Sequence, residues 1–162
     1  MARSLPVPRI DAESRGFWEA CNRGELYLQR CRSCRTLRYY PRAVCPQCLA
    51  SEIEWVRSGG RGSVYSFTVT YQNNAPGFRE RLPYVLAYVE LDEGPRMLTN
   101  IVECPPENVH IGMAVRVTFP GRSDAPAAGV SSGVSTQASR ETAEGVSLPR
   151  FCPVDAPAPL SE

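Results

Sequence analysis

Two Cys-x-x-Cys pairs constrain this chain more than any other feature of its sequence. The first pair is Cys31 and Cys34, the second is Cys45 and Cys48, and residues 35–44 separate them. Each pair presents two sulfurs from one tight turn, and four thiolates at about 2.3 Å from the metal form the tetrahedral site that zinc prefers. We therefore predict a rubredoxin-like zinc ribbon with one Zn²⁺ per chain. The metal would be structural, because a closed four-cysteine site leaves no open position for water or substrate.

Other chemistry is compatible with paired cysteines. A single Cys-x-x-Cys is also typical of a redox site, and four cysteines can form disulfides or hold iron. Two pairs in register, with no βαβ pattern around them, favour zinc over these alternatives. A catalytic zinc site is disfavoured, since all four expected ligands are cysteines.

Length and charge limit the function classes. The 162 residues are enough for one ordinary domain and a small module. The formal net charge is +1, which is poor support for nucleic-acid binding because such domains are normally basic. The sequence has no run of eighteen apolar residues, and its first residues lack the apolar core of a signal peptide. Seven cysteines, four of them in zinc spacing, suit a reducing compartment, so we expect a cytoplasmic protein.

The first part of the chain contains one candidate helix. Asp11 is expected to cap a helix over residues 12–23, and Gly24 is expected to end it. Phe17 and Trp18 fall on one apolar stripe of this helix. The spacing favours packing of this stripe on the chain's own core. The alternative is that Phe17 and Trp18 dock on a partner subunit.

Short alternating strands with turn signals between them follow the cysteine pairs over residues 63–119. No long helix interrupts them, so we predict a mostly β fold: an N-terminal helix, the zinc ribbon, and a five-stranded OB-fold barrel. Residues 122–145 lack large apolar side chains, which predicts a disordered insertion or linker. The predicted units are an N-terminal arm and helix (1–24), the ribbon (25–57), the barrel (58–121), the insertion (122–145), a closing strand of the barrel (146–154) and a loose tail (155–162).

A catalytic set is not apparent in the sequence. His110 is the only histidine, and a single His in a polar turn is more typical of a surface residue than of a base. Cys21, Cys104 and Cys152 would need an activating base or a positive environment to act as nucleophiles. The chain also lacks a phosphate-binding glycine loop and a Gly-x-Ser-x-Gly elbow. We therefore assign no catalytic residue.

The loop over residues 72–84 is the main candidate for binding, since loops between the strands of OB barrels commonly form the ligand or partner surface. Arg79 and Arg81 would pair there with CoA phosphates or with acidic groups of a partner. The alternative is a solvated loop whose Phe78 plugs the barrel end. The candidates for contact with acyl-CoA or a partner are Phe17, Trp18, Phe78, Arg79, Arg81 and Tyr84.

Nucleic acid is the competing ligand class, because zinc ribbons and OB barrels often bind it. Tyr65, Phe67 and Tyr71 share an alternation phase with Val69 and would stack on bases or pack on a core. Residues 61–121 contain five Arg and six acidic residues, a balance that repels a phosphate backbone. The arginines of the ribbon are explained by compensation of the zinc–thiolate charge; they are Arg30, Arg32, Arg35, Arg38 and Arg42.

Several segments together carry a family resemblance. They are Phe17-Trp18, Gly24 to Cys34, Tyr40 to Cys48, Gly62 to Val69, Leu82 to Gly94, Ile111 to Phe119 and Val146 to Pro153. In this order they resemble the zinc-ribbon/OB-fold family of acyl-CoA-associated proteins of bacteria and archaea. The departure is the segment 122–145, where that family usually makes a short turn.

The resemblance implies a non-catalytic accessory subunit. Such subunits accompany a thiolase-like, ketosynthase-like, aldolase or enoyl-CoA hydratase subunit, contribute subunit contacts, and sometimes form a wall of the acyl-CoA site. The expected partner is a thiolase-superfamily enzyme that carries the catalytic residues in a hetero-oligomer. The alternatives are an enoyl-CoA hydratase complex and a nucleic-acid-binding module.

Overall fold

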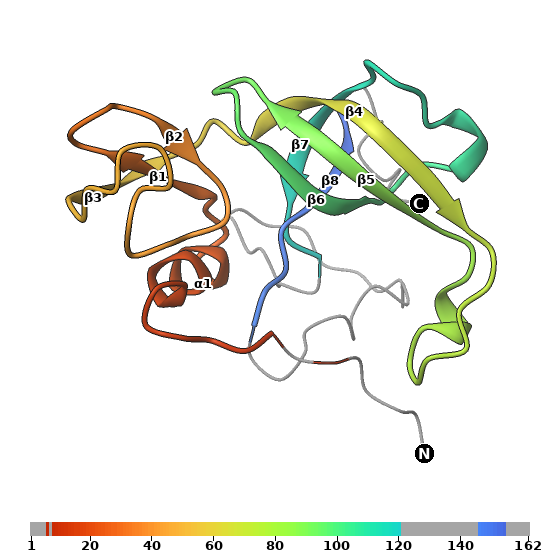
Figure 1. The fold of residues 1–162 in the computed structure, drawn as a ribbon. Coiled ribbons are helices and arrows are strands. Elements are labelled where there is room, and N and C mark those ends of the chain that lie inside the picture. Colours follow the sequence, from red (N-terminus) through yellow and green to blue (C-terminus); the bar gives the residue numbers. More distant parts are fainter. Residues whose placement is uncertain (1–5, 7, 121–145, 155–162) are drawn as a thin grey trace, which may run out of the picture.

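The computed structural model of the chain describes residues 6, 8–120 and 146–154. The insertion expected over 122–145 and the tail expected over 155–162 lie outside the described residues. Figure 1 shows a small ribbon module beside α1 and a larger barrel. The elements are α1 (Arg15–Asn22), β1 (Tyr27–Cys31), β2 (Leu37–Arg38), β3 (Ile53–Arg57), β4 (Arg61–Thr70), η1 (Arg79–Arg81), β5 (Tyr84–Leu91), β6 (Arg96–Ile101), η2 (Pro106–Asn108), β7 (Ala114–Thr118) and β8 (Arg150–Pro153). This order confirms the predicted fold class.

The helix α1 is shorter than the predicted range of 12–23. Asp11 still organises its start: the Asp11 carboxylate accepts hydrogen bonds from the backbone N–H of Ser14 at 2.8 Å and from its hydroxyl at 2.6 Å. These bonds lower the pKa of Asp11 and form a reciprocal cap, since the Ser14 hydroxyl also accepts the Asp11 N–H at 3.2 Å. At the other end Gly24 has a φ of 79°, which lets the next N–H return to the carbonyl of Ala20.

The ribbon is an antiparallel sheet of three strands in the order β2-β1-β3. The barrel is closed, with the order β4-β5-β6-β8-β7. The strand β8 runs antiparallel to β7 and parallel to β6, so the segment from 150 to 153 closes the barrel. Within the described residues, no helix has the length and hydropathy that a bilayer crossing requires.

A β-bulge between Val64 and Ser66 changes the inside–outside phase of β4. Val64 points into the core, whereas Tyr65 is 48% exposed. After the bulge Phe67 packs against the core. The common face expected for Tyr65 and Phe67 is therefore wrong, because a sequence alternation takes no account of an extra residue in the ladder.

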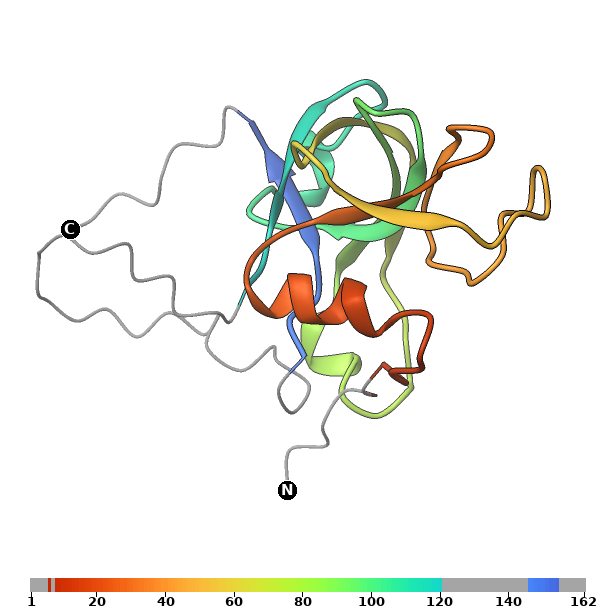
Figure 2. The same cartoon turned by 90° about the vertical axis from the view of Figure 1, so that its left-hand side faces the viewer.

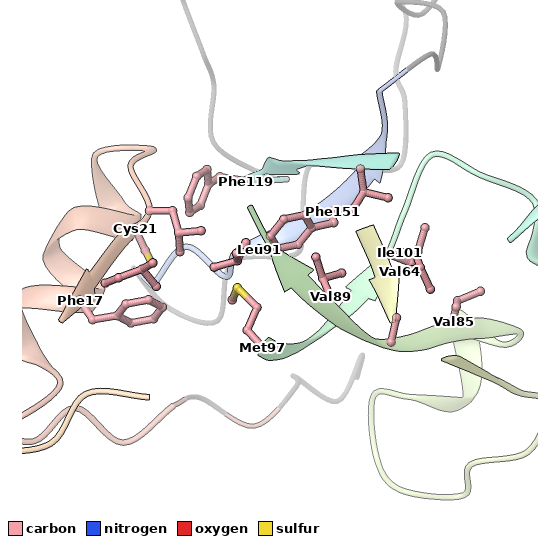
Figure 3. Packing of buried hydrophobic residues seen from close by; sticks show 14 of the residues in the cluster. Phe17, Cys21, Val64, Val85, Val89, Leu91, Met97, Ile101, Phe119 and Phe151 are labelled. Carbon is pink, nitrogen blue, oxygen red and sulfur yellow. The ribbon is translucent and has the colours of Figure 1, made fainter. Parts of the chain in front are cut away.

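One hydrophobic core joins the two modules. Figure 3 shows Phe17 and Cys21 of α1 next to the barrel side chains Leu91 and Met97. Phe17 and Cys21 are fully buried, and both belong to the same buried cluster as Phe151 of β8. Each fully buried large side chain contributes about 1.5–3 kcal/mol through its removal from water. The helix, the ribbon and the barrel therefore stabilise one another.

Polar contacts fix the connection between ribbon and barrel. Glu93, in the β5–β6 turn, accepts hydrogen bonds from the Ser58 hydroxyl at 2.9 Å and from the Gly59 N–H at 2.7 Å. The Ser58 N–H donates to the carbonyl of Leu26 in the ribbon at 2.8 Å. Gly60 follows with a φ of 69°. The connection is thus tied to both modules.

A single methyl group added at Gly62, near the start of β4, is expected to destabilise the fold. A Cβ on Gly62 would lie 2.3 Å from the Glu90 carbonyl oxygen, a backbone atom that cannot rotate away. We expect Gly62→Ala to lower the free energy of unfolding by about 2 kcal/mol or more. Gly59→Ala is the matched control, since its Cβ would meet only Glu93 Oε1 at 3.7 Å. Urea denaturation followed by circular dichroism measures both, and equal stabilities would contradict the prediction.

Candidate metal centre and barrel-end cavity

The structure brings the four predicted cysteine ligands together at one end of the ribbon. Their Sγ atoms all lie within 4.8 Å of one another. Cys31 and Cys48 approach to 3.6 Å, and so do Cys34 and Cys45. A tetrahedron with Zn–S bonds of about 2.3 Å has edges of about 3.8 Å. The cluster therefore fits one zinc ion.

The two knuckles repeat one backbone design. In each knuckle the N–H that follows the second cysteine bonds to the carbonyl of the first: Arg35 to Cys31 at 3.0 Å, and Leu49 to Cys45 at 2.8 Å. Both Arg35 and Leu49 have a φ of 64°, which is unusual for residues other than glycine. Figure 2 shows the knuckle loops, in orange, projecting from the side of the molecule. The turns hold two sulfurs each on the same side of the ribbon.

The environment of Cys34 favours the thiolate that zinc binds. The Thr36 hydroxyl lies 3.3 Å from Cys34 Sγ. This hydrogen bond is the main cause that lowers the pKa of Cys34 to about 6. When bound, the zinc would supply structural cross-linking of the two knuckles through Cys31, Cys34, Cys45 and Cys48.

Arg38 has a structural role that its sequence position does not reveal. It is buried, and its Nε and Nη2 donate to Gln29 Oε1 at 3.0 and 2.9 Å. Its guanidinium also donates to the carbonyls of Arg42 and Val44, in the loop between the two knuckles. Gln29 Oε1 accepts the Arg42 N–H as well, at 2.9 Å. The guanidinium thus holds the inter-knuckle loop against β1.

Three other arginines of the ribbon gather around Glu54 of β3. Arg30 forms a hydrogen-bonded ion pair with its carboxylate, and Arg32 and Arg35 lie at 3.4 and 3.9 Å. The hydrogen bond from Arg30 is the main cause that lowers the pKa of Glu54. Together the three guanidiniums balance the charge of Glu54 and of a zinc ion with four thiolates.

The aromatic pair of α1 is placed in the chain's own core. Phe17 is fully buried, and its ring lies 5.0 Å from that of Trp18 and 5.5 Å from that of Tyr39. Trp18 is 7% exposed, and its indole N–H donates to the Tyr40 hydroxyl at 3.2 Å. This packing agrees with the favoured interpretation that the stripe packs on the chain's own core. Contact of Phe17 and Trp18 with a partner stays a prediction. Tyr39 and Tyr40 of the ribbon cover this stripe.

Three of the loop candidates meet at one end of the barrel. Phe78, Arg81 and Tyr84 line a cavity of about 290 Å³, whereas Arg79 of the same short helix η1 does not line it. Tyr84 is fixed from the side, since its hydroxyl accepts the Asn73 amide N–H at 2.9 Å. The Phe78 and Tyr84 rings lie 6.3 Å apart. Phe78 and Tyr84 thus pack at the barrel end, whereas Arg79 and Glu80 of the same loop are exposed.

The far wall of this cavity consists of residues that the sequence did not single out. Arg150 of β8 donates from Nη1 to Asn100 Oδ1 at 2.7 Å, and Asn100 Nδ2 donates to the Val85 carbonyl at 3.0 Å. Both side chains line the cavity. They come from strands that lie far apart in the sequence, so only the barrel closure brings them together.

The remaining candidate nucleophiles are not activated. Burial raises the pKa of Cys21 to about 12, and it also raises the pKa values of Cys104 and Cys152. A protonated thiol is a poor nucleophile. His110 is exposed in the turn before β7, with its Nδ1 3.0 Å from the Asn108 carbonyl.

Comparison with known proteins identifies the family. Residues 18–54 match the ChsH2 rubredoxin-like zinc ribbon domain, and residues 55–120 match the ChsH2 C-terminal OB-fold domain. A DUF35 domain-containing scaffold protein of Methanothermobacter thermautotrophicus is 34% identical over 100 residues, which are 60% of this chain and 73% of that protein. The chain belongs to the DUF35 family.

Two further relatives of this DUF35 chain are informative. A chain in the solved structure of the Ltp2-ChsH2(DUF35) aldolase is 33% identical with a TM-score of 0.70, and the match covers 91% of this chain and 98% of that one. The "Probable enoyl-CoA hydratase alpha subunit" of Thermomonospora curvata is 40% identical over 110 residues. Those residues are 68% of the DUF35 chain but 34% of the relative, so the chain spans about a third of that relative's length.

The metal centre can be tested with a substitution that removes little buried surface. Cys48 is exposed, so Cys48→Ser removes one zinc ligand and little buried surface. We expect the variant to lose most of its zinc and to unfold at a lower temperature, because metal binding and folding of the ribbon are coupled. Elemental analysis and thermal unfolding measure both quantities. Cys104→Ser, outside the cluster, should retain one zinc per chain; equal zinc content in the two variants would contradict the assignment.

The buried guanidinium yields a second test. Arg38→Lys keeps the charge but cannot donate at once to Gln29 and to two loop carbonyls. We expect zinc affinity to fall by about tenfold or more, since residues behind metal ligands commonly have such effects. Competition with a chromogenic chelator measures the affinity. Arg35→Lys, at a side chain that is 67% exposed, is the control; a similar loss in both variants would refute the role of Arg38.

Proposed function

We propose that this DUF35 chain is a non-catalytic accessory subunit. It docks on a thiolase-superfamily enzyme and helps to form or stabilise the acyl-CoA site of that partner. The partner supplies the nucleophile and the bases. The cytoplasm is the proposed location, because the zinc ligands must stay reduced.

One observation carries the proposal. The same order of helix, zinc ribbon and OB barrel is found along 98% of a chain from the Ltp2-ChsH2(DUF35) aldolase, at 33% identity. The relative from Methanothermobacter thermautotrophicus is likewise named a scaffold protein. The buried, protonated thiols of Cys21 and Cys152 support the non-catalytic part of the proposal.

The barrel-end cavity supports a contribution to the acyl-CoA site. Its wall combines the apolar side chains of Phe78 and Tyr84 with the guanidiniums of Arg81 and Arg150. Apolar walls suit an acyl or pantetheine chain, and guanidiniums suit carbonyl or phosphate oxygens. A partner surface would complete this cavity.

An enoyl-CoA hydratase is the second candidate partner. The relative from Thermomonospora curvata favours it, at 40% identity over the matched residues. The nucleic-acid alternative has weaker support, because residues 61–121 contain five Arg and six acidic residues and so carry no excess of positive charge.

Purification of the full chain from its source cell tests the proposal. A tagged chain is isolated at moderate salt, and co-purifying proteins are identified and quantified by mass spectrometry. We expect a thiolase-superfamily subunit in near-stoichiometric amount. A hydratase subunit would shift the assignment to the second candidate, and nucleic acid without any acyl-CoA enzyme would overturn the proposal.

Variants of the two arginines of η1 distinguish a role of the cavity in acyl-CoA binding from a role of the exposed surface. Arg81 lines the cavity and Arg79 does not, although the two belong to one helical turn. In the reconstituted complex we expect Arg81→Ala to raise the KM for acyl-CoA about tenfold or more, because a charge-assisted hydrogen bond is lost. We expect Arg79→Ala to change it less than about threefold. Steady-state kinetics measure both; equal effects would contradict a role for the cavity.

A further inference from the structure

The outer surface of the barrel carries a group of half-exposed apolar side chains. Tyr88 of β5 lies directly opposite Leu98 of β6 in the antiparallel register, and Ser66 of β4 lies on its other side. Tyr65 and Tyr88 are each 48% exposed, and Leu98 is 47% exposed. We refer to Tyr65, Tyr88, Arg96 and Leu98 as the outer barrel face. The strands that carry it lie side by side in Figure 1.

The outer barrel face is electrically neutral. The Arg96 guanidinium carbon lies 3.5 Å from the centre of the Tyr65 ring, and Arg96 Nε lies 2.6 Å from Glu90 Oε2. The hydrogen bond that Arg96 donates to the Glu90 carboxylate raises the pKa of Arg96. Glu90 and Arg96 are the only charged residues of β5 and β6, and each neutralises the other.

A hollow adjoins this face at Leu98. It has a volume of about 170 Å³, and its apolar walls include Trp18 of α1, Tyr39 of the ribbon and Leu148 before β8. Asn100 and Arg150 line both this hollow and the barrel-end cavity, so their hydrogen bond of 2.7 Å separates the two. A surface formed by both modules thus runs from Tyr65 to the cavity.

We propose that the outer barrel face and its hollow form the surface on which the enzyme subunit docks. The inference rests on the proposed function and names the site of that assembly. The occupant is a neutral, apolar protein surface that places one large apolar side chain in the hollow beside Leu98. The same contact brings the partner to the Asn100–Arg150 wall of the barrel-end cavity.

Chemistry favours a protein over a nucleic acid on this surface. Tyrosine, tryptophan and arginine are enriched at the energetic centres of protein interfaces, where charged residues are otherwise few. Arg96 of this face is already paired with Glu90. A protein that binds there therefore needs no acidic group to pair with Arg96. A phosphate backbone would find no net positive charge on the outer barrel face, where Glu90 offsets Arg96.

Site-specific photo-crosslinking tests the docking surface on the full chain. A benzoylphenylalanine is introduced in place of Tyr88 or Leu98, and the tagged protein is irradiated in its source cell. Ile111, which is 70% exposed in the turn before β7 and outside this surface, is the control position. Zinc content and circular dichroism verify that each variant is folded.

We expect adducts from positions 88 and 98 to an acyl-CoA enzyme subunit, with several-fold fewer adducts from position 111. If the wild-type chain retains that subunit but adducts form only from position 111, the docking surface is wrong and the proposed function stands. If no acyl-CoA enzyme is retained by the wild-type chain, the proposed function itself fails. Adducts from 88 and 98 to nucleic acid, or to a second copy of this chain, overturn the inference.

The affinity of the complex provides an independent measurement. We expect Leu98→Asp to weaken assembly at least about tenfold, since a charge at a buried interface position loses its water. Leu98→Met keeps an apolar side chain and should bind within about threefold of the wild type. Ile111→Asp should have no effect. Equal affinities of the Leu98→Asp and Ile111→Asp variants would contradict the docking surface.

Discussion

The thiolate cluster is the constraint on which the rest of the structure depends. Cys31 and Cys48, and likewise Cys34 and Cys45, approach to 3.6 Å, a separation that suits four thiolates around one zinc ion. The strand that ends at Cys31 also carries Leu28 into the core that joins α1 to the barrel. Metal binding therefore stabilises more than the two knuckles, because the ribbon supplies one wall of the common core.

Polar contacts position the loops and cavity walls next to this common core. Glu93 ties the connection between the modules to the β5–β6 turn, and Arg38 orders the loop between the knuckles. The Asn100–Arg150 bond lies where the barrel-end cavity and the hollow beside α1 meet. A partner bound at that point would contact both modules at once. This arrangement suits a subunit that shapes the site of another protein.

The sequence predicted what depends on local pattern. Cysteine spacing predicted the metal ligands, and alternation predicted the strands of the barrel, because both signals lie within a few residues. The sequence did not predict features that depend on contacts between distant residues or on irregular strand pairing. The bulge at Tyr65 reverses the phase of one strand, Phe17 is covered by Tyr39 of the ribbon, and Asn100 meets Arg150 only after the barrel closes. A single sequence carries no signal for such pairings across fifty residues.

Acyl-CoA turnover by separated and recombined subunits tests the central claim most directly. The purified chain, the purified enzyme subunit and their mixture are assayed at equal concentrations, with the chain titrated into the enzyme. A non-catalytic accessory subunit predicts no turnover by the chain alone and an enzyme rate that rises to a plateau at a fixed ratio of the two. Turnover by the chain alone, or an enzyme rate independent of the chain, would contradict the account.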